Sequence, residues 1–254
     1  MNFNIQPINF NIANVRFKSN SNISQPKGSD LERNPKMDSF EMSIGYVNDA
    51  HGQTNNMMRI LSGIKGDLKL SAGDNDIGDE KNDAIHQATT KFLNIADIKA
   101  SALGNHEIDM SQKDCIDAIN RFNGLMLSIN FEQIPLEEQD PEDIQKYGRA
   151  DLKNHLTKSA VVEVKGEKIG LIGASPIDMM SRLTHPNYYT DCSVDDLDDT
   201  IELIQNEIDK FKEQNINKVI LVSHLGHKAD KFVAENIDGI DVIVGGHTHE
   251  LIKD

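Results

Sequence analysis

Short apolar runs and segments with a helical period alternate along the chain from residue 43 onward. Runs rich in β-branched and apolar residues predict strands, because such residues fit a buried, pleated backbone. The predicted strands, some with the loop that follows, are 43–52, 68–74, 98–107, 125–132, 217–226 and 240–250, and the predicted helices are 53–66, 82–97, 111–124, 193–215 and 228–237. This alternation favours an α/β fold with mostly parallel strand pairing.

Three segments depart from the alternation. Residues 159–175 predict a hairpin, in which two β-rich runs flank a turn at Gly166 and Glu167. Residues 131–158 fit no strand pattern and are expected to form an acidic surface insertion. Residues 1–40 are rich in Asn, Ser, Pro and Lys, and such a segment buries too little apolar surface to offset the entropy of ordering it. We therefore expect a disordered tail over 1–40 and one domain over 41–254.

Charge narrows the classes of partner. The formal net charge of the 254-residue chain is −15, which disfavours a nucleic-acid polymer or an anionic membrane as the main partner, because either would repel it. Bound cations can still attract a small anionic substrate. The two cysteines, Cys115 and Cys192, have no CxxC spacing and are expected to be free thiols. No obligate protein partner is indicated.

The sequence leaves the cellular compartment open. No apolar run approaches the roughly 18 residues of a membrane span. The first residues also lack a basic start followed by an apolar stretch, so they make a poor signal peptide.

Candidate metal ligands follow five of the predicted strands. The motifs are Asp49-Ala-His51-Gly, Gly-Asp74, Gly-Asn105-His106-Glu107, Ser-His224-Leu-Gly and Gly-Gly-His247-Thr-His249. Loops beyond the carboxyl ends of strands converge in open α/β sheets, so we expect these side chains to meet. Asp49 and His51 are two residues apart, as are His247 and His249, which on an extended backbone would project each pair to one side. A set of carboxylate, imidazole and amide ligands without sulfur suits Zn, Mn or Fe.

This ordered set of motifs resembles the calcineurin-like metallophosphoesterase superfamily, and the stretches YVNDAHG and GNHEID resemble its 5′-nucleotidase branch. The resemblance extends over about residues 43–250. It implies an α/β/β/α sandwich of two mixed sheets with the active site at the carboxyl ends of the strands. It also implies hydrolysis of a small phosphate monoester, with a nucleotide as the expected substrate.

The resemblance implies two divalent metal ions that share the carboxylate of Asp74. One ion would be held by Asp49, His51, Asp74 and His249, and the other by Asp74, Asn105, His224 and His247. Two ions about 3.5–4 Å apart clamp a phosphoryl oxygen and lower the pKa of a bound water.

Catalysis by side chains is assigned through the same resemblance to His106, oriented by Asp109. His106 would stabilise the transition state or protonate the leaving oxygen. Glu107 is expected to support the ligands from behind, and Asp76 and Asp79 to be solvated loop charges. His86, His155 and His185 are expected to have no catalytic role, and His227 is a weaker candidate for substrate contact.

The 5′-nucleotidase branch continues past its last histidine motif, so the resemblance implies that 41–254 is an incomplete catalytic domain without the nucleotide-binding C-terminal domain. The branch is largely exported, whereas the sequence itself fits a cytoplasmic protein. Three alternatives remain: a phosphodiesterase, a sulfur-ester hydrolase on the same scaffold, or a fragment that binds metal without turnover.

Overall fold

The structure is a computed structural model that describes residues 10–18, 39–53, 57, 63–76 and 83–250. Its larger sheet has five strands in the order β1-β2-β3-β4-β5. The bounds are β1 Phe10–Lys18, β2 Ser39–Val47, β3 Leu68–Ser71, β4 Ala100–Ala102 and β5 Leu125–Leu127. Strands β2 to β5 pair in parallel, and β1 joins β2 antiparallel. The carboxyl ends of β2, β3 and β4 therefore lie along one edge of this sheet.

The second sheet has four strands in the order β11-β10-β8-β7. The bounds are β7 Ser159–Val164, β8 Glu167–Ala174, β10 Val219–Ser223 and β11 Val242–Gly245. Strands β8, β10 and β11 are parallel, and β7 forms the expected hairpin with β8. Its turn is Lys165-Gly166, one residue earlier than predicted, and both residues have positive φ, as a two-residue hairpin turn requires.

The two sheets pack face to face around the main hydrophobic core. Ile44 and Leu70 of the first sheet lie in one buried cluster with Leu171, Ile220 and Val222 of the second. Residues that alternate with these along β8 and β10 face the opposite way and contact a layer of helices. Burial on both faces explains why β10 is a continuous apolar run rather than an alternating one.

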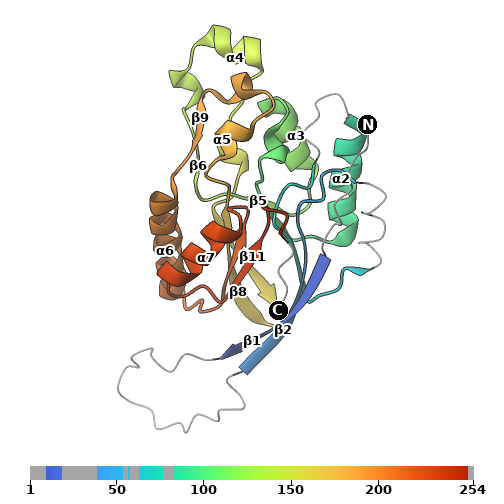
Figure 1. Cartoon of the computed structure of the whole chain (residues 1–254), viewed down its shortest axis with the longest axis vertical. Coiled ribbons are helices and arrows are strands. Elements are labelled where there is room, and N and C mark those ends of the chain that lie inside the picture. The colour runs from blue at the N-terminus through green and yellow to red at the C-terminus, as the bar shows by residue number, and fades with distance from the viewer. Residues whose placement is uncertain (1–9, 19–38, 54–56, 58–62, 77–82, 251–254) are drawn as a thin grey trace.

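Helices cover the outer face of each sheet, which completes the expected α/β/β/α sandwich (Figure 1). α6 (Leu197–Glu213) and α7 (His227–Asn236) lie against the four-stranded sheet, where Ile204, Ile208 and Phe211 are buried. α2 (Asp83–Ala96) and α3 (Gln112–Arg121) lie on the side of the five-stranded sheet. The helix expected over 53–66 lies mostly outside the described residues. No described helix has both the length and the apolarity to cross a membrane.

Two expectations about the irregular segments are wrong. Residues 10–18 of the expected disordered tail form β1, which pairs with β2 along its whole length. The segment 131–158 is not purely a surface insertion, because Phe131 and Leu152 are buried in a core cluster with Tyr189. Residues of this segment form β6 (Phe131–Gln133), which pairs antiparallel with β9 (Cys192–Val194).

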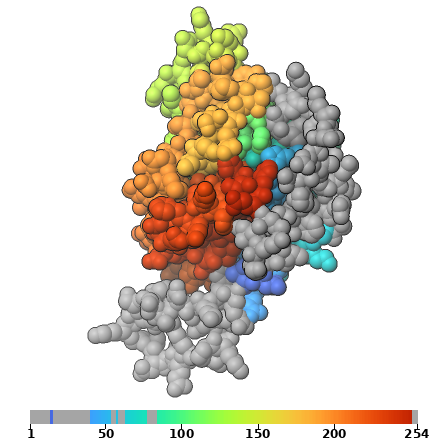
Figure 2. All heavy atoms as spheres, viewed as in Figure 1, coloured from blue at the N-terminus to red at the C-terminus, as the bar shows by residue number. Residues whose placement is uncertain are grey.

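The rest of that segment stands out from one end of the molecule. It contains α4 (Pro141–Tyr147) and short 3-10 turns, and Figure 2 shows it in yellow-green. The remaining short elements are η1 (His106–Ile108), η2 (Leu136–Glu138), η3 (Lys153–His155), α5 (Met179–Arg182) and η4 (Pro186–Tyr189).

Gly173 of β8 packs tightly against Leu127 of β5 in the other sheet, and Gly173→Ala is expected to destabilise the fold. A Cβ at this position would overlap Leu127 Cβ and lie 2.5 Å from the Leu127 carbonyl carbon, so the backbone must shift. Overpacking of this kind costs about 1–3 kcal/mol in the free energy of unfolding. Urea denaturation would measure it, with Gly166→Ala as the control, since a Cβ there meets no atom within 4 Å. Because Gly166 has φ +83°, its cost is backbone strain alone. Unchanged stability of Gly173→Ala would contradict the packing explanation.

Candidate metal centre

The structure brings the predicted ligands together from loops of both sheets. Asp49 and His51 follow β2, Asp74 follows β3, and Asn105 follows β4. From the other sheet, His224 follows β10, and His247 and His249 follow β11. The carboxylates and imidazoles fall into three compact groups: Asp49 with His51 and His249, Asp74 with His224 and His247, and His51 with Asp74 and His106.

The first group joins the loop after β2 to the loop after β11. His51 Nε2 lies 3.0 Å from His249 Nε2, and His249 Nε2 lies 3.4 Å from Asp49 Oδ1. Two nitrogen ligands, each about 2.0–2.1 Å from one zinc ion, stand roughly 3–3.4 Å apart. The spacing of these donor atoms therefore fits a shared cation.

The second group and the neighbouring Asn105 contain possible metal-ligand atoms that have no hydrogen-bond partner among the described residues. His224 Nδ1 lies 2.5 Å from the Ala72 carbonyl oxygen, which can only accept, so Nδ1 carries the proton. His224 Nε2 faces Asp74 Oδ2 at 3.0 Å, but this contact lacks hydrogen-bond geometry. Among the described residues, neither His224 Nε2 nor the buried Asn105 Oδ1 has a hydrogen-bond partner. Buried nitrogen and oxygen atoms without a hydrogen-bond partner, next to a carboxylate, are suited to bind a metal ion.

The charges of the cluster favour a positive charge at His224. Burial alone would lower the pKa of His224, but the charge of Asp74 outweighs it and raises that pKa to about 9. Burial likewise opposes ionisation of Asp74, yet His224 holds the Asp74 pKa well below its usual range. The buried carboxylates thus favour a cation here, either a proton on His224 or a metal ion in its place.

The backbone at five of the seven candidate ligands is left-handed, not extended as the sequence spacing suggested. Positive φ angles occur at Asp49 (51°), His51 (44°), Asp74 (51°), His247 (80°) and His249 (53°). Such angles are uncommon outside glycine, and they cluster at functional sites where surrounding contacts enforce them. Sharp turns after the strands, rather than the two-residue alternation of a strand, direct these side chains into the centre.

His106 lies beside the ligands and is anchored by Asp109. His106 Nδ1 lies 2.6 Å from Asp109 Oδ2, and Asp109 Oδ1 accepts a hydrogen bond from the Thr184 amide. Burial opposes protonation of His106, but the hydrogen bond to Asp109 outweighs it and raises the His106 pKa. The ring is also 4.8 Å from that of His51, so His106 shares a group with candidate ligands.

Glu107 organises the loops that carry Asp74 and Asn105. Its Oε2 accepts hydrogen bonds from the Asp74 and Gly104 amides, both at 2.9 Å, and its Oε1 accepts from the Asn75 amide at 2.6 Å. Burial, with the charge of Asp74, raises the Glu107 pKa to about 7. Glu107 therefore supports the loops that carry the candidate ligands, as expected from the sequence.

The expected environment of Asp76 is wrong, and the sequence did not single out Asp178. Asp76 is not a solvated loop charge, because it is buried and lies 2.6 Å from His86 Nδ1. Asp79 lies outside the described residues. Asp178 Oδ1 lies 3.1 Å from His247 Nε2, although its loop has no motif that points to the site.

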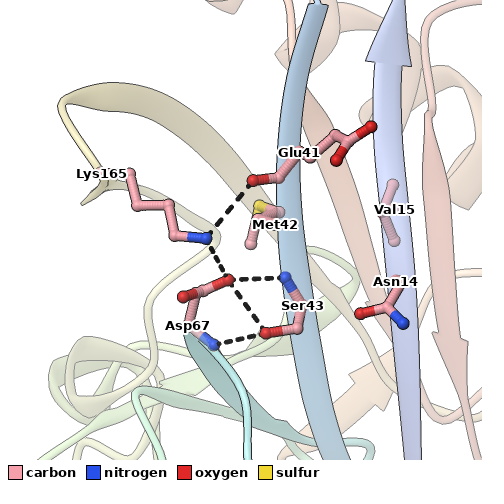
Figure 3. A pocket seen from close by; sticks show the side chains of 7 residues that line it. All are labelled: Asn14, Val15, Glu41, Met42, Ser43, Asp67 and Lys165. Atoms are coloured by element: carbon pink, nitrogen blue, oxygen red, sulfur yellow. Dashed lines mark hydrogen bonds and ion pairs between the residues drawn. The ribbon is translucent and has the colours of Figure 1, made fainter.

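One hollow lies beside the centre, and another lies at the opposite end of β3. One, of about 360 Å³, is lined by His227, Thr248 and His249, so His227 faces a space beside a candidate ligand. The other, of about 780 Å³, lies between the β1–β2 ribbon and the β7–β8 turn (Figure 3). There Lys165 Nζ lies 2.6 Å from Asp67 Oδ2. Asp67 precedes β3, so this hollow is at the opposite end of the strand from Asp74.

The two other histidines without an expected role have local contacts. His155 Nδ1 lies 3.2 Å from Asn120 Oδ1, and the His185 ring lies 5.7 Å from that of Tyr188.

Comparisons with known proteins identify the family of the chain. A family model described as calcineurin-like phosphoesterase matches residues 42–251. A 5′-nucleotidase of Diplobatis ommata is 32% identical over 162 residues, covering 63% of this chain and 25% of that protein. An apyrase of Anopheles gambiae is 31% identical over 242 residues, covering 84% of this chain and 40% of that protein.

Among solved structures, a 5′-nucleotidase precursor from Thermus thermophilus superposes with a TM-score of 0.64 at 24% identity. The match covers 83% of this chain and 42% of that one. The chain thus spans between about a quarter and two fifths of the length of these proteins.

Proposed function

Because the chain belongs to the calcineurin-like phosphoesterase family, we propose that it hydrolyses phosphate monoesters of nucleotides with two divalent metal ions. One observation carries the proposal: oxygen and nitrogen donors from five strand ends converge, and the buried Asn105 Oδ1 and His224 Nε2 have no hydrogen-bond partner among the described residues. The relatives named 5′-nucleotidase and apyrase support a nucleotide as the substrate.

Asp74 is the proposed bridge between the two ions. Its Oδ2 lies 3.9 Å from His51 Nε2 on one side and 3.0 Å from His224 Nε2 on the other. Asp49, His51 and His249 would complete one ion's ligands, and Asn105, His224 and His247 those of the other. Bound ions of this kind polarise a phosphoryl oxygen and activate water for attack. They also supply the local positive charge that a chain of net charge −15 needs to bind phosphate.

His106 is the proposed proton donor. Asp109 can only accept from His106 Nδ1, so Nδ1 carries a proton, and a raised pKa favours a proton on Nε2 as well. The His106 side chain is 30% exposed, so part of the ring is open to solvent and substrate. It would donate to the phosphoryl or leaving oxygen as negative charge develops there. Asp109 keeps the ring in this orientation.

A metal-dependence assay on the whole chain tests the function. Protein treated with EDTA and then reloaded with Mn²⁺ or Zn²⁺ would be assayed for phosphate release from AMP and ADP. Bis-p-nitrophenyl phosphate would serve as the diester comparison. We expect AMP hydrolysis that EDTA abolishes and that reloading restores. Isothermal titration of the same sample would count the ions bound.

The possible outcomes separate the candidate functions. Hydrolysis of the diester but not of AMP would replace the proposal with a phosphodiesterase. Two bound ions without turnover of either ester would favour a chain that binds metal without catalysis. Phosphate release that survives EDTA would contradict metal dependence itself.

A further inference from the structure

The contact between His247 and Asp178 determines which nitrogen of His247 is available to an ion. His247 Nε2 lies 3.1 Å from Asp178 Oδ1. An ionised carboxylate can only accept a hydrogen bond, so the proton of this contact belongs to Nε2. A neutral imidazole has one proton, and its lone pair is then on Nδ1.

Asp178 is itself held in place from the other side. It is the residue before α5, and its Oδ2 lies 2.5 Å from Nε of Arg182, four residues on. One carboxylate therefore accepts from His247 with one oxygen and from Arg182 with the other. The pair is at the rim of the centre, because the Asp178 side chain is 39% exposed whereas that of His247 is 10% exposed.

The other two anchored histidines of the centre are held through the opposite ring nitrogen. His224 is held through Nδ1 by the Ala72 carbonyl, and His106 is held through Nδ1 by Asp109. In both, Nε2 is the nitrogen left for chemistry. His247 is held through Nε2 instead, so its chemistry falls on the opposite nitrogen.

We propose that Asp178 is the positioning residue of His247, and that it holds Nε2–H so that Nδ1 is the ligand of the second metal ion. Arg182 in turn fixes Asp178. The inference rests on the proposed function only in requiring an ion at His247. Carboxylates that hold a metal-binding histidine in this way orient the ring and raise its basicity, and their loss typically lowers metal affinity about 10–100-fold.

Metal titration of substituted whole chains tests the proposal. Asp178→Ala is expected to weaken binding of one Mn²⁺ ion by about 10–100-fold and leave the other unchanged. Asp178→Asn should lose less, because the amide oxygen still accepts from Nε2–H. Asp209→Asn is the matched control, since Asp209 is a surface carboxylate paired with Lys212 on α6. A double variant of Asp178→Ala with His247→Ala should bind the ions no more weakly than His247→Ala alone.

A spectroscopic readout identifies the nitrogen directly. In the Zn²⁺-loaded protein, long-range ¹H–¹⁵N spectra should show His247 protonated at Nε2, with the shift of a metal-bound nitrogen at Nδ1. Protonation at Nδ1 with a metal-bound Nε2 would overturn the proposal, as would Asp178→Ala binding both ions with parental affinity. A parent chain that binds no second ion would overturn the proposed dinuclear function and this inference together. Two ions in the parent with unchanged affinities in Asp178→Ala would overturn the inference alone.

Discussion

Asp74→Asn is expected to reduce bound metal from about two ions per chain to one or fewer and to abolish phosphate release. Asp74 is 2% exposed and lies between the two ligand groups, so neither ion keeps its full set of ligands without it. An amide of the same shape has no negative charge to offset two dications, and it cannot place an oxygen on both sides. Metal analysis of protein dialysed against Mn²⁺, run beside the AMP assay, would measure both effects.

Asp97→Asn is the matched control for Asp74→Asn. Asp97 also has a left-handed backbone, with φ 59° against 51° at Asp74, and asparagine tolerates that conformation. Its carboxylate contacts surface lysines rather than the centre. The control should keep full metal content and activity. Two ions retained in Asp74→Asn would exclude this carboxylate as the bridge.

His106→Ala is expected to leave metal content unchanged while lowering turnover at least about a hundredfold, the usual cost of losing one transition-state donor. The reason is that His106 contributes a proton and a positive charge rather than a ligand. His155→Ala is the control, because His155 lies on the surface by Asn120. Turnover of the two variants with AMP, together with their metal content and thermal unfolding, would be compared.

Metal content is the decisive measurement for His106, because its ring shares a group with His51 and Asp74. If His106→Ala loses an ion, His106 is a ligand and its assigned role is wrong. If the variant keeps both ions and parental turnover, proton donation comes from elsewhere. Thermal unfolding would detect any structural cost of leaving Asp109, which is buried, without its histidine partner.

Much of the architecture follows from the sequence because it depends on strong periodic signals. β10 is apolar up to its final Ser223 and β8 is apolar from Ile169 onward, and α6 has both an aspartate cap and an apolar face. Placing ligands after successive parallel strands then gathers them at one edge, whatever the details of the loops. The residues that meet at the centre could be named for this reason.

What the sequence did not predict depends on weak or distant contacts. β6 and β9 are three residues each and about 60 positions apart, too short for a periodic pattern to show. β1 lies in a polar segment, and its partner β2 rather than its own composition accounts for its order. Asp178 occurs in an irregular loop, so only its contact with His247 reveals it.

The left-handed ligand residues also bear on attempts to engineer this protein. A side chain held at positive φ costs of order 1–3 kcal/mol relative to a relaxed backbone, and five such residues meet at one point. Glycine would relieve that strain at His51 or His249, so selection for heat resistance alone would favour erasing the ligands. Backbone strain at the centre thus lowers the stability of the fold while it places the ligands. A thermostabilised variant should therefore keep these residues unchanged.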